Sequence, residues 1–157
     1  MQIKLIAIGK TDRKEYEAII ADFQKRVGFY IKFDFEIVPD IKNNKNLSEE
    51  QQKLQEGRLF LQKIQSQDVV VLLDEHGKTF NSVHFANYLQ KKMNASTKQL
   101  IFLIGGPYGF SEEIYQRANE KISLSEMTFS HQMIRFIFIE QLYRAMTILR
   151  HEPYHHQ

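Results

Sequence analysis

Two runs of consecutive apolar residues, 69–73 and 100–104, constrain the fold of this chain more than any other feature. Each has the length of a β-strand, and neither shows the alternation of a strand with one face in water. Runs of this kind are typical of parallel sheets that are covered by helices on both faces. Residues 3–8, which are apolar except for Lys4, form a third strand-like segment that ends at Gly9. The chain is therefore expected to contain a central sheet of buried parallel strands.

The segments between these runs have the periodicity of helices. Asp12, with Glu15 three positions later, predicts the start of a helix that ends at Gly28, and Ser48 with Gln51 forms a capping box for a second helix. Residues 31–37 alternate between apolar and charged, which predicts a strand near the sheet edge. Further helices are expected from Ser82, from Ser111 and over 131–150, with a short strand over 121–125. This alternation predicts an α/β fold with a mostly parallel sheet and helices on both faces, in one domain spanning 1–157.

The last predicted helix is apolar on nearly all sides. Twelve of the 18 residues from 132 to 149 are apolar, whereas the terminal helix of a small domain normally keeps one wet face. Burial of the second face by another copy, in a two-fold homodimer, is the interpretation we favour. A helix in the middle of the monomer is the alternative.

Composition excludes several classes of protein. The chain has no cysteine, so it has no thiol nucleophile and no cysteine-bound zinc. Its 21 Lys+Arg and 19 Asp+Glu give a net charge of +2, far from the basic stripe of a dedicated nucleic-acid module. No apolar run approaches the roughly 18 residues of a membrane span, and a cytoplasmic protein without membrane contact is expected.

Three segments carry candidate chemistry. Residues 104–110 place three glycines directly after a buried strand, where ligands bind in α/β sheets, although a tight turn before a helix explains them equally well. Their order fits neither a dinucleotide fingerprint nor a P-loop. Residues 124–131 mix hydroxyl, carboxylate and apolar side chains, but Thr128 or Ser130 alone could be a helix cap. The tail, 151–157, holds Tyr and His, and Pro153 argues against a metal site between His151 and His155.

Taken in order, residues 104–110, 123–132, 139–145 and 153–155 resemble the ribosomal RNA large subunit methyltransferase H family. The resemblance extends to residues 6–10 and 38–40 and so covers essentially the whole chain. Members of this family are SPOUT enzymes that methylate N3 of a pseudouridine in 23S rRNA. The resemblance implies a homodimer with a C-terminal trefoil knot, which physical rules alone would not propose.

The resemblance also implies S-adenosylmethionine as cofactor, with no metal. The matched cofactor-binding residues are Leu73, Gly105, Leu124, Ser125, Glu126, Met127, Thr128 and Phe129. Because a neutral histidine accepts protons, His131 is the first candidate for the group beside the uracil ring. Arg135 and Arg144 are expected to pair with RNA phosphate or with negative charge developing on the base. Tyr154 and His155 are expected to close over a flipped base.

Two positions depart from the family pattern. Ser130 stands where proline is common, and His156 stands where Arg or Lys is common.

Two rival functions stay open: a knotted methyltransferase acting on tRNA or another rRNA position, and a non-catalytic ribosome-binding dimer. The small net charge predicts weak binding to free RNA and makes the assembled ribosome the better substrate.

Overall fold

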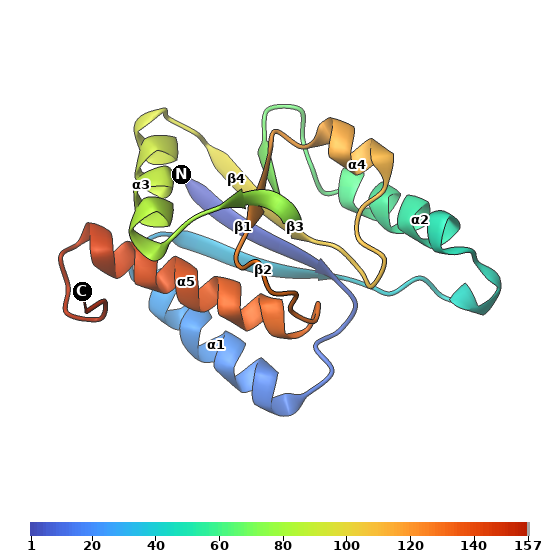
Figure 1. The fold of residues 1–157 in the computed structure, drawn as a ribbon, viewed down its shortest axis with the longest axis horizontal. Coiled ribbons are helices and arrows are strands. Elements are labelled where there is room, and N and C mark those ends of the chain that lie inside the picture. Colours follow the sequence, from blue (N-terminus) through green and yellow to red (C-terminus); the bar gives the residue numbers. More distant parts are fainter. Residues whose placement is uncertain (157) are drawn as a thin grey trace.

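A computed structural model describes residues 1–156 and shows a five-stranded sheet in which every pair of neighbours is parallel (Figure 1). The last residue of the tail and of the expected domain, Gln157, lies outside the described residues. The strand order is β2-β1-β4-β3-β5. The strands are β1 (Gln2–Ile8), β2 (Lys32–Val38), β3 (Val69–Thr79), β4 (Gln99–Ile104) and β5 (Glu120–Ser123). The helices are α1 (Lys14–Gly28), α2 (Glu49–Leu61), α3 (Ser82–Asn94), α4 (Glu112–Arg117) and α5 (Met133–Leu149), with a 3₁₀ turn at Asn44–Asn46.

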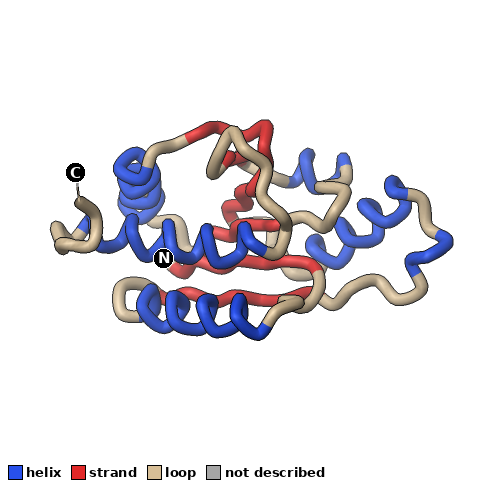
Figure 2. Tube along the Cα trace, turned by 60° about the horizontal axis from the view of Figure 1, so that its bottom comes forward, coloured by secondary structure: helices blue, strands red, loops and turns tan. Residues whose placement is uncertain are grey.

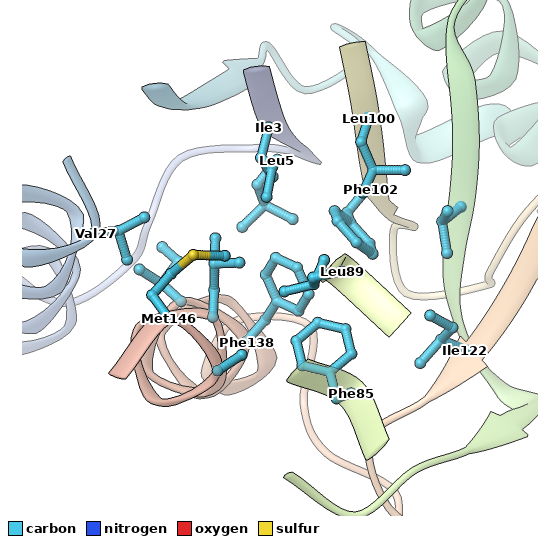
Figure 3. Close-up of a cluster of buried hydrophobic side chains, with 14 of the residues drawn as sticks. Ile3, Leu5, Val27, Phe85, Leu89, Leu100, Phe102, Ile122, Phe138 and Met146 are labelled. Carbon is cyan, nitrogen blue, oxygen red and sulfur yellow. The ribbon is translucent and has the colours of Figure 1, made fainter. Parts of the chain in front are cut away.

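Alternate side chains along the buried strands enter two separate cores. Leu100 and Phe102 on β4 pack with α1, α3 and α5, whereas Ile101 and Leu103 pack with α2 and α4. In Figure 3, Phe102 and Phe138 of α5 lie close together, with their ring centroids 4.6 Å apart. Figures 1 and 2 show α1, α3 and α5 on one side of the sheet and α2 and α4 on the other. The expected α/β fold with helices on both faces is confirmed.

Strand predictions agree with the structure in position and differ in length. The run ending at Ile104 is the middle strand, and the alternating segment is the edge strand β2. β3 continues to Thr79, beyond the predicted Leu73: β4 ends opposite Leu73, and β3 pairs with β5 again at Lys78 and Thr79 after a shift in register. The residues after Leu73 are mostly polar, so the apolar pattern predicted that the strand ends there. A strand with a single neighbour can expose its side chains to solvent and so can be polar.

Helix ends agree less well with the sequence patterns. The capping box of Ser48 and Gln51 is present, but α1 begins after Arg13 without a side-chain cap, so the predicted Asp12–Glu15 start is wrong. Asn81, rather than Ser82, caps α3 by accepting the His84 N–H. The last helix is shorter than predicted at each end, because residues 131 and 132 form a turn and Arg150 is the C-cap.

α5 is the central helix of its layer. It packs between α1 and α3, and its side chains Phe138, Ile139 and Leu142 are fully buried. The monomer itself therefore explains much of the apolar character that the sequence pattern attributes to a dimer. No helix in residues 1–156 is long and apolar enough to span a membrane.

Candidate functional site

A cavity of about 580 Å³ opens where β4 and β5 end, beside the middle of β3. Its size falls within the roughly 300–1,000 Å³ of small-molecule sites. Three segments enclose it: residues 73–76 inside β3, and residues 104–110 and 122–131 at and after the ends of β4 and β5. Because parallel strands point their carboxyl ends to one edge, segments far apart in sequence meet here. The cavity is the candidate site.

Most of the predicted cofactor residues lie in its wall. Those lining the cavity are Leu73, Gly105, Leu124, Ser125, Met127, Thr128 and Phe129. Glu126 belongs to the same loop, but it is not among the lining residues. Seven of the eight cofactor-binding positions that the family resemblance implies therefore line the cavity.

The glycine segment forms a tight turn that shapes one wall. The Gly109 N–H donates to the Gly106 carbonyl at 3.1 Å, and Gly109 adopts φ +82°, a left-handed conformation that favours glycine. A Cβ at Gly105 would lie 3.0 Å from the Gly109 carbonyl oxygen. Any side chain at Gly105 must therefore displace the turn that lines the cavity.

Hydroxyl side chains organise the loop between β5 and α5. The Ser125 hydroxyl accepts the Met127 N–H at 2.9 Å, and Thr128 donates to Glu75 at 3.1 Å, which joins this loop to β3. Ser130 accepts the Met133 N–H at 3.1 Å, across the turn that precedes α5. The N-cap position of α5 is Gln132, which makes no side-chain cap hydrogen bond, so Ser130 holds this turn and is not the N-cap of the helix.

Sequence reasoning missed an ionised carboxylate in the wall. Asp74 lines the cavity, and it accepts hydrogen bonds from the Tyr115 hydroxyl and the His76 backbone N–H. Burial raises the pKa of Asp74, but these two donors and the nearby charges of His76 and Lys121 lower it by more, so the net pKa is below its usual value. Tyr115 is 41 positions away on α4, and no local pattern signals the pair.

Of the residues predicted to carry catalysis, only His131 lines the cavity. It is partly exposed and stands just before α5. A histidine beside a cavity wall can accept a proton from a bound group. The cavity thus combines glycine backbone, an anionic carboxylate, apolar side chains and one imidazole.

Arg135, which we expected to pair with RNA phosphate or with negative charge developing on the base, lies inside the protein. Its side chain is fully buried and donates to the backbone carbonyls of Ile8, Gly9 and His131. A sequence does not show which arginines on an apolar helix face inward. Sequence reasoning also missed the partners at the end of β1, which are as far as 127 positions away.

Arg144, Tyr154 and His155 gather around Glu140, which lies near the middle of α5. Arg144 donates to Glu140 at 2.6 Å, and Tyr154 donates to the same carboxylate oxygen at 3.0 Å. The Arg144 guanidinium lies 4.7 Å from the centre of the Tyr154 ring and 3.4 Å from the His155 ring nitrogen. This tail cluster, defined by these four residues, is ordered against the helix. In Figure 1, the C-terminus lies just past the C-terminal end of α5, and the loop that precedes α5 lies at the opposite end of this helix.

A buried carboxylate lies directly beneath the glycine turn. Glu56 is 3% exposed, and one of its oxygens has no hydrogen-bond partner among residues 1–156. That oxygen would lie 2.5 Å from a Cβ added at Gly106, and the other oxygen accepts from Gln52 at 3.0 Å. Burial is the main cause that raises the pKa of Glu56, and Asp40 adds to it.

We expect Glu56→Gln to make the stability of the protein less sensitive to pH. A raised carboxyl pKa contributes stability below its unfolded value of 4.5, and this contribution is lost as the pH rises through the folded pKa. Each tenfold difference in proton affinity between the folded and unfolded chain corresponds to roughly 1.4 kcal/mol. Urea unfolding between pH 4.5 and 8 should therefore show a smaller decline for Glu56→Gln than for wild type. The control is Glu50→Gln on the same helix, where the side chain is 83% exposed; equal declines in all three proteins would contradict the assignment.

Comparisons with known proteins identify the family of this chain. A family model described as "Predicted SPOUT methyltransferase" matches residues 1–155. The chain is 66% identical to the Ribosomal RNA large subunit methyltransferase H of Flavobacterium johnsoniae and 63% identical to that of Christiangramia forsetii. It is 60% identical to the protein of the same name from Parabacteroides distasonis, and all three alignments cover 100% of both chains. The chain therefore belongs to the SPOUT methyltransferase family.

Proposed function

We propose that this protein transfers a methyl group from S-adenosylmethionine to N3 of a pseudouridine in 23S rRNA. The observation that carries the proposal is that seven of the eight expected cofactor positions line one cavity, in a chain that matches rRNA methyltransferases along its full length. The assembled ribosome in the cytoplasm is the proposed substrate. The small net charge of +2 supports this proposal, because a protein with little net positive charge binds free RNA weakly.

The residues of the cavity suit S-adenosylmethionine. The glycines of the turn at 105–109 expose backbone N–H and C=O groups at the cavity wall, and these can form hydrogen bonds with adenine or ribose. Leu124 and Phe129 offer apolar contacts to a flat ring. Asp74 supplies negative charge, which favours a ligand that carries a sulfonium and an ammonium group. When bound, the cofactor supplies an electrophilic methyl group.

His131 is the proposed acceptor of the N3 proton. It lines the cavity beside Ser130 and Ile134, so a base held at the cavity mouth would lie next to its imidazole. Proton removal by a positioned side chain contributes about 10²–10⁴-fold to rate, and holding the two reactants in line adds to this.

The positions of His131 and of the tail cluster support a homodimer. Glu140 and Arg144 lie 9 and 13 residues after His131, roughly 14 and 20 Å along a helix, so His131 and the tail cluster of one chain are held apart. A two-fold partner can bring its own Arg144, Tyr154 and His155 to the cavity. Met127 is 77% exposed and Met133 38%, which leaves apolar surface near the cavity for the partner to cover.

We also propose that α5 completes a trefoil knot, because it follows directly from a loop that lines the same cavity as residues 104–110.

Gly105→Val is expected to weaken S-adenosylmethionine binding at least ten-fold, about 1.4 kcal/mol. The reason is that its Cβ already meets the Gly109 backbone at 3.0–3.3 Å, so the branched side chain must displace the turn. Isothermal titration calorimetry on the purified protein measures the change. The matched control is Gly28→Val, where an added Cβ meets nothing within 4 Å. Equal affinities in the two variants would place the cofactor elsewhere, and no binding by wild type would remove the enzyme function.

Deleting residues 153–157 should spare cofactor binding and abolish methyl transfer to ribosomes. The removed Tyr154 and His155 do not line the cavity of their own chain, but they are proposed to complete the partner's site. The measurements are calorimetry with S-adenosylmethionine and transfer of radiolabelled methyl to ribosomes from a strain lacking the gene.

Dimers formed from two different variant chains test whether each active site uses residues of both chains. Co-expressed His131→Ala and tail-deleted chains should regain part of the activity, since one of the two sites in a mixed dimer then has an intact histidine and an intact tail. Full activity of the tail-deleted protein alone would contradict a role for the tail. A tRNA product in place of an rRNA product would favour the rival substrate.

A further inference from the structure

We propose that Gln132 and Arg135 form a clamp that positions His131 for methyl transfer by tying the start of α5 to the end of β1. Both are positioning residues: neither lines the cavity, whereas His131, directly beside Gln132, does. This inference rests on the proposed function, in which His131 acts on the base.

Arg135 holds the end of β1 with a fully buried guanidinium. Its Nη2 donates to the Ile8 carbonyl at 2.7 Å, and its Nη1 donates to the Gly9 carbonyl at 2.9 Å and to the Thr11 hydroxyl at 3.2 Å. Hydrogen bonds from a charged donor are stronger than those between neutral groups. The strand end is therefore fixed to α5 by three charge-assisted bonds.

The same guanidinium group also binds the backbone of the proposed proton acceptor. Arg135 Nε donates to the His131 carbonyl at 3.1 Å, so one side chain binds both the strand end and the histidine's own peptide unit. Burial lowers the pKa of Arg135, while Asp12 and Asp40 offset part of this effect. An arginine remains protonated in proteins, so the clamp keeps its charge at working pH.

Gln132 makes a second, independent tie. Its Nε2 donates to the Lys10 carbonyl at 3.0 Å, and its Oε1 accepts the Asp12 N–H at 3.2 Å. The side-chain amide therefore uses both its donor and its acceptor on the segment that follows β1. Together, Gln132 and Arg135 bind residues 8–12 over a sequence separation of at least 120 positions.

The clamped segment is itself restricted. Gly9 adopts φ +78°, and a Cβ there would lie 2.5 Å from the Asp40 carboxylate. Because β1 is buried between β2 and β4, its end is a rigid reference point for α5. The position of His131 is thus set by the middle of the sheet, and not only by the loop before it.

The experiment compares Gln132→Met and Arg135→Lys with wild type. We expect kcat for ribosome methylation to fall at least ten-fold, while the Kd for S-adenosylmethionine changes less than three-fold. The ring signals of His131 in a ¹H–¹³C NMR spectrum should shift or broaden in both variants. The lysine keeps the charge but loses the forked geometry, so it should not restore kcat.

A matched control separates positioning from loss of stability. Val27→Ala removes buried volume on α1, in the same core but away from the cavity and the clamp. At equal loss of Tm, Val27→Ala should keep the wild-type kcat and the His131 signals. Clamp variants with wild-type kcat, or with a loss no larger than that of Val27→Ala, would overturn the proposal. If Arg135→Lys does not fold, Gln132→Met decides the outcome by the same criteria, and an inactive wild type would instead refute the proposed function.

Discussion

Parallel pairing of β3, β4 and β5 is the constraint on which the site depends. Because the three strands point the same way, the loops that follow β4 and β5 meet beside the middle of β3. The sheet becomes irregular after Leu73: β4 ends opposite this residue, and the pairing of β3 with β5 shifts register between Leu73 and Lys78. Asp74 and Glu75 lie in this irregular stretch and line the cavity together with the glycine turn.

α5 distributes the proposed chemistry between two places. His131 stands beside the cavity just before the first residue of α5, and the tail cluster packs around Glu140 and Arg144 further along the helix. A rigid helix keeps these groups apart within one chain. On this account the dimer is part of the catalytic unit, and the buried clamp at Arg135 sets the position of the first group relative to the sheet.

Sequence patterns located the sheet and the loops that line the cavity well because these depend on local signals. Apolar segments marked β1, β3 and β4, and the glycines and hydroxyls that follow β4 and β5 marked the cavity. Contacts between distant residues had no such signal. The Asp74–Tyr115 pair, the unpartnered Glu56 oxygen and the inward direction of Arg135 all depend on tertiary packing.

Mass spectrometry of 23S rRNA from a strain that lacks the gene tests the central claim most directly. The account predicts that one pseudouridine loses a single methyl group at N3, and that the wild-type gene, but not a His131→Ala copy, restores it. Identical 23S rRNA from the two strains would contradict the proposed activity. A methyl group lost from a different nucleotide would keep the methyltransferase and refute its proposed target.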